Sequence, residues 1–134
     1  MFGGEIVKSR VTPTARTLAE CRKRGWIAQC VEQTIPHTFI KRDLFGVIDI
    51  VAVTPDGILG IQATGGSGGA HAARRNKIKA EPRAEKWLAA GAGLEIWSWA
   101  KQGKAGARKL WTLRVERIEI ADFAELRATD LRLA

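Results

Sequence analysis

The segment at residues 45–64 constrains the chain most, because it combines two short apolar runs with one acid set among them. It reads FGVIDIVAVTPDGILGIQAT. The β-branched runs on either side of Pro55-Asp56-Gly57 predict two strands, 49–53 and 58–63, joined by a tight turn. Asp49 lies among Val and Ile side chains, where a carboxylate loses solvation and needs a partner such as a metal ion or a buried cation. The pattern therefore predicts a functional carboxylate within a β-hairpin.

Two polar residues end the second predicted strand. In a hairpin, Asp49 and Gln62 lie on neighbouring strands, and Thr64 shares a face with Gln62 because side chains alternate along a strand. The hairpin thus predicts a small polar group that combines a carboxylate, an amide and a hydroxyl.

With its Gly46-Val47-Ile48-Asp49 entry, this hairpin resembles the PD-(D/E)xK nuclease superfamily, the fold of many restriction enzymes and Holliday junction resolvases. That family carries an Asp on one strand and an acid-x-Lys triplet on the next, and here Gln62-Ala63-Thr64 stands in place of the triplet. The resemblance implies an α/β fold with a mixed central β-sheet flanked by helices, the restriction-endonuclease-like αβββαβ core. It covers roughly residues 14–100 and is closest to small phage-type and resolvase-like members.

The length of 134 residues fits one domain, so we expect a single nuclease-like domain over 1–134. No apolar run is long enough to span a bilayer, and the N-terminus shows no signal pattern, which favours a cytoplasmic protein without a membrane partner. The net charge of +8 is unevenly distributed: residues 8–24 hold six cations against one acid, and residues 71–86 hold six against two. Clustered Lys and Arg favour a polyanion such as DNA, although a basic run can also be only a solvated helix face.

The remaining pattern predicts further helices and strands. A helix begins at Thr12 or Thr14 and ends near Arg24, and another begins near Ala70, with Pro82 either kinking it or starting a further helix that ends at Gly91. We expect strands at 26–35, 94–99 and 109–118, and a short amphipathic helix from Asp122. Three of the five Trp residues, Trp97, Trp99 and Trp111, lie in predicted strands of alternating pattern, so sheet packing is favoured over base stacking for these three.

The resemblance also implies a cofactor, Mg²⁺ or Mn²⁺, because hydrolysis of a phosphodiester uses a bound divalent ion with hard oxygen ligands. Asp49 is the first predicted ligand, Glu20 on the first helix is the second, and Gln62 replaces the second acid of the family. Thr64 stands where the family has Lys and offers no positive charge. We expect Lys77 to supply that charge from the following helix.

The basic helix provides the predicted contacts with nucleic acid. Arg74, Arg75, Lys77 and Lys79 are the candidate phosphate-binding residues, with the two arginines as forked donors. Asp43 is either a further metal ligand or a turn residue before the hairpin. His71 is either a proton relay or phosphate contact, or a merely exposed histidine at a helix start.

Two functions from different classes follow. The first is a metal-dependent DNA endonuclease that is phage-derived or resolvase-like, for which the resemblance also implies a homodimer. The second is a catalytically inactive nucleic-acid-binding protein on the same scaffold, favoured by the Gln62-Ala63-Thr64 substitution. A structural or assembly protein with no nucleic acid partner remains a third alternative.

Overall fold

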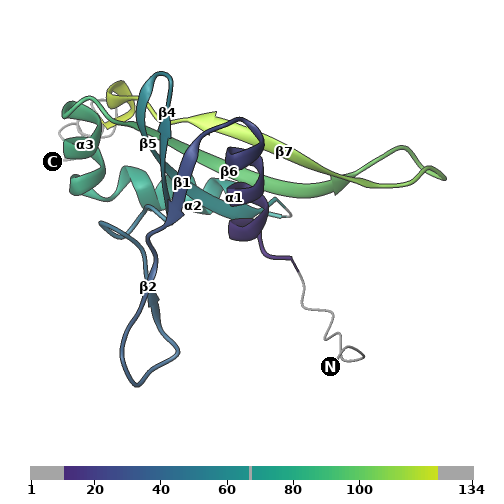
Figure 1. Ribbon diagram of the computed structural model, residues 1–134, viewed down its shortest axis with the longest axis horizontal. Helices are drawn as coiled ribbons and strands as arrows, with labels where there is room; N and C mark the ends of the chain where they lie inside the picture. Colours follow the sequence, from purple (N-terminus) through teal and green to yellow (C-terminus); the bar gives the residue numbers. More distant parts are fainter. Residues whose placement is uncertain (1–10, 67, 124–134) are drawn as a thin grey trace, which may run out of the picture.

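The protein has an α/β fold with a mixed five-stranded β-sheet flanked by helices, as seen in a computed structural model that describes residues 11–66 and 68–123 (Figure 1). Its elements follow in chain order: α1 (Pro13–Lys23), β1 (Ile27–Cys30), β2 (Gln33–Thr34), β3 (Lys41–Arg42), β4 (Ile50–Thr54), β5 (Gly57–Gly65), α2 (Ala70–Lys79), α3 (Pro82–Ala89), β6 (Gly93–Gln102) and β7 (Leu110–Arg117).

The large sheet has the order β1-β4-β5-β6-β7. Its central pair, β5 and β6, is parallel, and the other neighbours are antiparallel. A parallel pair needs a crossover connection, and α2 with α3 provides it. The predicted hairpin is confirmed as β4 and β5, where Ile50 pairs with Ile61 and Thr54 with Gly57.

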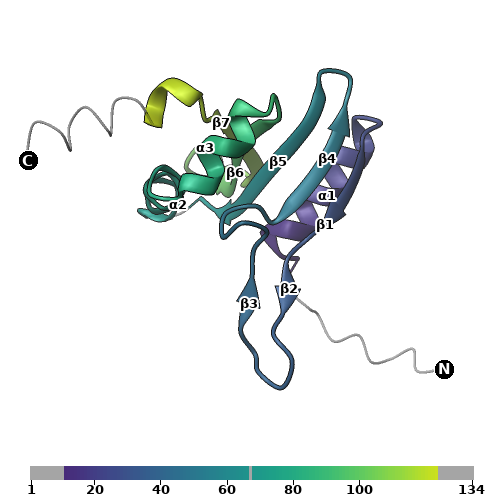
Figure 2. The ribbon, with the colours of Figure 1, turned by 90° about the vertical axis from the view of Figure 1, so that its left-hand side faces the viewer.

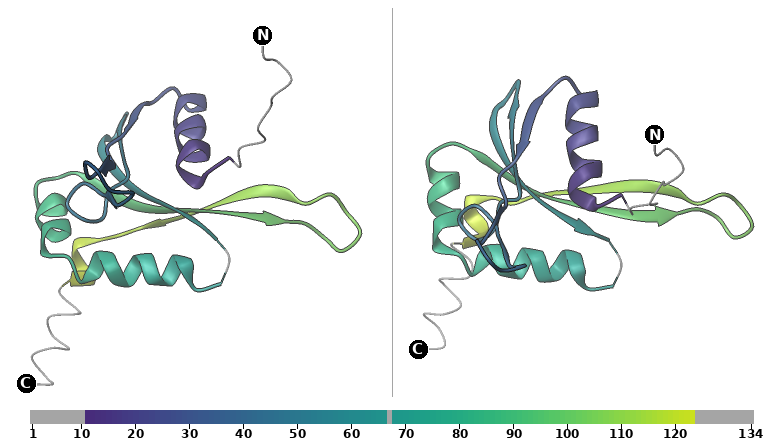
Figure 3. Two further views of the ribbon diagram at one scale, coloured as in Figure 1. Left: turned by 90° about the horizontal axis from the view of Figure 1, so that it is seen from below. Right: turned by 60° about the horizontal axis from the view of Figure 1, so that its bottom comes forward.

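Helices cover both faces of this sheet (Figure 3). Helix α1 packs on one face, over a core that includes Cys21, Ile61 and Trp97. Helices α2 and α3 pack on the other, over a core that includes Ile78 and Ile96. Ile96 and Trp97 are adjacent in β6, and because successive side chains point to opposite faces they belong to different cores. Any residue on α1 is therefore separated by the sheet from any residue on α2.

The predicted helices agree with local signals at their ends. The Thr12 hydroxyl accepts a hydrogen bond from the Ala15 amide at 3.1 Å, with Pro13 in the first turn of α1. Pro82 starts α3 rather than kinking α2, and the Glu81 carboxylate caps the new helix at the Arg83 amide. The helix expected from Asp122 lies mostly outside the described residues, which show a helical turn at 120–123.

The predicted strand at 26–35 is instead two strands in two sheets. Residues of β1 pair with β4, whereas β2 pairs with β3 in a separate two-stranded sheet. Figures 1 and 2 show this second sheet projecting from the body as a narrow hairpin, which we call the arm (residues 33–42). Its attachment to the body lies beside the start of β4.

The aromatic prediction holds for two of the three strand tryptophans. Trp97 is fully buried and Trp99 is buried, but Trp111 is 43% exposed under the guanidinium of Arg16. Within residues 11–66 and 68–123, none of the helices has the length and apolar character that crossing a bilayer requires.

Candidate metal centre

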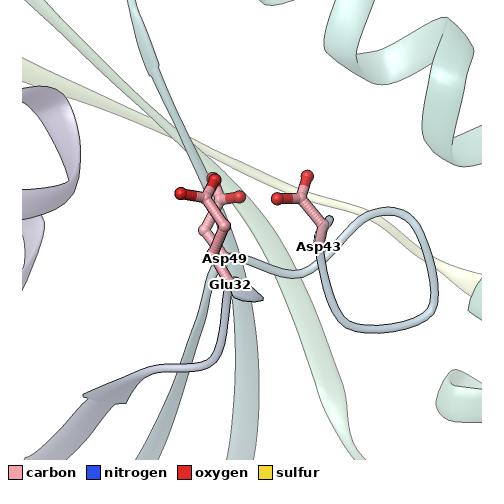
Figure 4. Close-up of side chains that lie close together, drawn as sticks. All are labelled: Glu32, Asp43 and Asp49. Carbon is pink, nitrogen blue, oxygen red and sulfur yellow. The ribbon is translucent and has the colours of Figure 1, made fainter. Parts of the chain in front are cut away.

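Three acidic side chains converge where the arm joins the sheet. Glu32, Asp43 and Asp49 each offer a carboxylate oxygen within 4.8 Å of the others (Figure 4). We call these three residues the acidic cluster. Glu32 immediately precedes β2, Asp43 immediately follows β3, and Asp49 immediately precedes β4, so the cluster brings together the base of the arm and the start of the central hairpin.

A tight loop brings two of these acids together. Residues 43–49 reverse direction through an antiparallel bridge between Leu44 and Ile48, and the Gly46 amide donates to the Asp43 carbonyl at 3.0 Å. Gly46 has φ +78, a conformation that favours glycine, and a Cβ there would lie 3.2 Å from side-chain atoms of Arg83 and Glu81. The Gly-x-x-Asp entry noted in the sequence is thus the turn that presents Asp49.

Strand pairing brings in the third acid. The Val31 amide donates to the Asp49 carbonyl at 2.8 Å, and the Asp49 amide donates to the Ile61 carbonyl at 2.9 Å. Asp49 therefore continues the β4 ladder on both sides, and the residue that follows Val31 is Glu32. The position of Glu32 depends on the register between β1 and β4.

Asp49 is the most buried acid of the cluster. It is 4% exposed, and one of its oxygens, Oδ2, accepts from the Gln62 amide nitrogen at 2.6 Å and from the Ala63 backbone at 2.9 Å. Burial, with a smaller contribution from the neighbouring Asp43 carboxyl, raises the pKa of Asp49 to about 8, although the Ala63 hydrogen bond lowers it. The structure therefore contains the desolvated carboxylate that the sequence predicts, and Gln62 lies beside it on the neighbouring strand, as the hairpin predicts.

The donor set fits a hard divalent cation. Gln62 is 2% exposed, and its Oε1 atom is buried without a hydrogen-bond partner among the described residues. Mg²⁺ and Mn²⁺ favour carboxylate and carbonyl oxygens, and the three carboxylates supply that chemistry, whereas Gln62 presents its amide nitrogen to the cluster. A bound cation would also lower the pKa of Asp49, which burial and the neighbouring Asp43 carboxyl raise.

One cation of α2 reaches the cluster. The Lys77 ammonium donates to Asp43 Oδ2 at 3.3 Å, with the Asp43 side chain only 11% exposed. Burial alone would raise the pKa of Asp43, but the hydrogen bond with Asp49 and the charge of Lys77 outweigh it and lower that pKa. Asp43 is thus a member of the cluster as well as a turn residue, and Lys77 is the predicted cation closest to it.

Other predicted residues lie elsewhere. Glu20 pairs with Arg24 on α1 at 2.9 Å, and because α1 covers the opposite face of the sheet from α2, the structure does not bring Glu20 to the acidic cluster. The Thr64 hydroxyl donates to the Gly65 carbonyl at 3.2 Å. Arg74 and Lys79 are half-buried on α2, as expected of side chains that retain access to solvent.

His71 and Arg75 belong to a second polar group, which we call the Glu116 network. His71 is 4% exposed, its Nδ1 pairs with Ser98 Oγ, and its Nε2 pairs with Glu116 Oε1 at 2.7 Å. Arg75 donates twice to the same carboxylate. Both ring nitrogens of His71 are occupied, so the structure contradicts the exposed histidine and gives it a positioning role at the start of α2.

A cleft of about 720 Å³ opens beside the acidic cluster. It is lined by residues of the arm base and the 43–49 loop, among them Glu32, Asp43, Arg42 and Phe45, and by Arg83 of α3.

Comparisons with protein-family models, with curated proteins and with solved structures give no match to this chain. The assignment of the acidic cluster as a candidate metal site therefore rests on its geometry alone.

Glu32 is the member of the cluster that sequence reasoning missed. Its sequence signal is weak: one acid within the predicted strand 26–35, eleven residues before Asp43. Only the pairing of β1 with β4 shows that it lies beside Asp49.

Proposed function

We propose that this protein is a metal-dependent endonuclease that hydrolyses phosphodiester bonds in DNA. The observation that carries the proposal is the convergence of Glu32, Asp43 and Asp49 next to the Lys77 ammonium, at the end of a β-hairpin. The chain order α1, β1, β4, β5, α2, β6 supports a restriction-endonuclease-like αβββαβ core of the PD-(D/E)xK type, with the arm and α3 as insertions.

The residues divide the chemical work. Glu32, Asp43 and Asp49 would hold a Mg²⁺ or Mn²⁺ ion, and the Gln62 amide, which presents its nitrogen to Asp49, would have to turn over to offer its oxygen as a neutral fourth donor. A divalent ion bound there polarises the phosphate and lowers the pKa of a bound water. Lys77 provides the fixed positive charge that the Gln62-Ala63-Thr64 segment lacks, and it stabilises negative charge that develops on the phosphate oxygens.

The basic helix supplies affinity. Arg74 lies three residues before Lys77 and on the same face of α2, so it can bind a phosphate next to the cleaved bond, whereas Lys79 lies on the opposite side of the helix and adds positive charge at longer range. Each neutralised phosphate releases counterions, and binding should weaken steeply with salt. Cleavage of both strands of a duplex calls for two copies of the site, which a homodimer provides.

The test is cleavage of supercoiled plasmid and of a four-way branched DNA with Mg²⁺ or Mn²⁺. The proposal requires cleavage by the parent, loss of cleavage in Asp49→Ala, and parent-like cleavage in Asp56→Ala, whose acid lies exposed at the β4–β5 turn. Parent-level cleavage by Asp49→Ala would refute the assignment.

One observation favours the alternative, an inactive DNA-binding protein on this scaffold. Gln62 donates to Asp49 through its amide nitrogen, so the neutral residue in place of the second acid of the family satisfies Asp49 without a metal. Calorimetric titration with Mn²⁺ separates the two functions. The binding protein predicts no heat of metal binding, together with salt-sensitive DNA affinity that metal does not change.

A further inference from the structure

The arm carries an exposed aromatic side chain at its tip. Phe39 is 103% exposed and the adjacent Ile40 is 60% exposed. A fully exposed Phe gains nothing from the fold, and exposed apolar groups of this kind mark interaction sites when the surroundings support one.

Hydrogen bonds order the tip around Phe39. The Thr38 hydroxyl donates to the Ile35 carbonyl at 2.8 Å and accepts from the Ile40 amide at 3.1 Å. The Ile35 amide also donates to the Ile40 carbonyl at 2.9 Å. The backbone on both sides of Phe39 is therefore ordered, which lowers the backbone entropy lost when the ring stacks on a partner.

The arm continues directly from the acidic cluster. Glu32 precedes its first residue and Asp43 follows its last, and Figure 2 shows the arm projecting from that point. The arm contains Lys41 and Arg42 and no acid. Five extended residues span about 16 Å at roughly 3.3 Å each, which corresponds to about five nucleotides of one DNA strand.

We propose that the arm is a substrate-recognition element whose Phe39 ring stacks on an unpaired or unstacked nucleobase, within about five nucleotides of the phosphate at the acidic cluster. The inference rests on the proposed function and adds its substrate class, branched or distorted DNA. Aromatic side chains stack on any exposed base, and apolar wedges stabilise opened base steps.

Size and charge favour a nucleobase over a second copy of this chain. A Phe ring buries roughly 150–250 Å². A stable interface buries roughly 800 Å² on each partner. The two arm cations, Lys41 and Arg42, and the net charge of +8 attract DNA and repel another copy.

The experiment measures DNA affinity in EDTA, where no cleavage interferes. Two DNAs carry 2-aminopurine at the same position: one has that base unpaired at a branch, and the other is an intact duplex. The proteins are the parent, Phe39→Ala, Phe39→Trp and the control Ile58→Ala, whose side chain is 44% exposed at the β4–β5 turn. We expect Phe39→Ala to weaken binding of the branched DNA by about 5- to 150-fold, the range for one stacked base.

The remaining readouts fix the interpretation. Duplex affinity should stay within about twofold for every variant, Phe39→Trp should restore branched binding, and 2-aminopurine fluorescence should change only in complexes with an aromatic residue at position 39. Equal losses on both DNAs, no loss at all, or a dimer that Phe39→Ala converts to monomer in sedimentation would overturn the inference.

Calorimetry with Mn²⁺ keeps the two proposals separate. Metal binding without a Phe39 effect rejects the recognition element alone. A Phe39 effect without metal binding rejects the nuclease and leaves the arm as a DNA-binding element.

Discussion

Two acidic centres contact helix α2, and their electrostatic settings are opposite. In the acidic cluster, three carboxylates face one another, with Lys77 at 3.3 Å from Asp43, and the pKa of Asp49 rises to about 8 because of burial and the neighbouring acid. In the Glu116 network, one carboxylate meets Arg75 and His71, and their hydrogen bonds lower the pKa of Glu116 to about 2. Both groups contact cations of α2, but only in the Glu116 network is the negative charge compensated by its partners within the fold.

This difference distinguishes the proposed metal site from a purely structural polar contact. In the Glu116 network both ring nitrogens of His71 have hydrogen-bond partners, so the network connects the start of α2 to β6 and β7. Its polar groups are satisfied without a ligand. The acidic cluster holds a carboxyl whose pKa is raised by burial, and the amide oxygen of Gln62 has no partner among the described residues; a bound cation would stabilise the ionised carboxylate. A buried ionisable group whose charge is not compensated by its neighbours is a candidate for a functional site.

The largest effect should come from Asp49→Asn. The variant keeps an acceptor for the Gln62 and Ala63 donors, but removes the central anionic ligand. Loss of an outer partner of a metal ligand already costs about 10- to 100-fold, so we expect cleavage to fall by more than about 100-fold. Initial cleavage rates in Mn²⁺ measure this, with Asp56→Asn as the matched control.

The same variant should be more stable than the parent at pH 9 without metal. A carboxyl whose pKa is raised by folding stays protonated in the native state while the unfolded chain is ionised, so stability falls as pH rises from about 4 to 8. Asn cannot ionise, and we expect a gain of about 1–3 kcal/mol at pH 9. Urea unfolding at pH 5 and pH 9 checks it, and a loss at pH 9 would show that the cluster is already balanced without metal.

The Glu116 network should respond in the opposite sense. Glu116→Gln removes the negative charge and replaces one of the two oxygens that accept from Arg75 with an amide nitrogen, and we expect a loss of about 1.5–3 kcal/mol at pH 7. Because the pKa of Glu116 is lowered on folding, its stabilisation is complete above its usual value and declines as pH falls toward 2. Unfolding curves from pH 2.5 to 7 measure the slope, and Glu119→Gln, at an exposed acid, should leave it intact.

The sequence predicts the helices and strands of this fold better than it predicts the tertiary contacts between them. The hairpin, the helix from Ala70 and the strand at 94–99 carry local signals: β-branched runs, a Pro-Asp-Gly turn and alternation. Asp49 beside Gln62 also followed from the hairpin alone. These relations involve residues within one supersecondary unit, where spacing fixes geometry.

The missed and misplaced residues depend on long-range pairing. Glu32 meets Asp49 only because Val31 pairs with Asp49 across β1 and β4, and no local pattern encodes that register. Glu20 lies on the face of the sheet opposite α2, a consequence of how α1 packs. The division of the predicted 26–35 strand into β1 and the arm likewise depends on which partner each half finds.

Lys77→Gln should produce a smaller effect than Asp49→Asn. It removes the cation beside Asp43 and keeps the metal ligands, so we expect cleavage to fall by about 10- to 100-fold while Mn²⁺ binding persists or strengthens. Rates and calorimetry on the same samples separate the two effects, with Lys86→Gln on exposed α3 as the control. Equal losses for both lysines would mean that only general positive charge matters.

Glu32→Gln should have the smallest effect and decides what the third acid does. Its carboxylate is 24% exposed and lies 3.7 Å from the Lys41 ammonium, so it is either a metal ligand at the rim or only the partner of that lysine. As a ligand, its loss weakens Mn²⁺ binding by about 3- to 10-fold, and Lys41→Gln strengthens binding by removing a competing cation. As a lysine partner only, both variants leave the Mn²⁺ affinity unchanged. Opposite responses to the two substitutions would therefore show that Glu32, at the base of the arm, is a metal ligand. The arm that carries Phe39 would then begin directly at the metal centre.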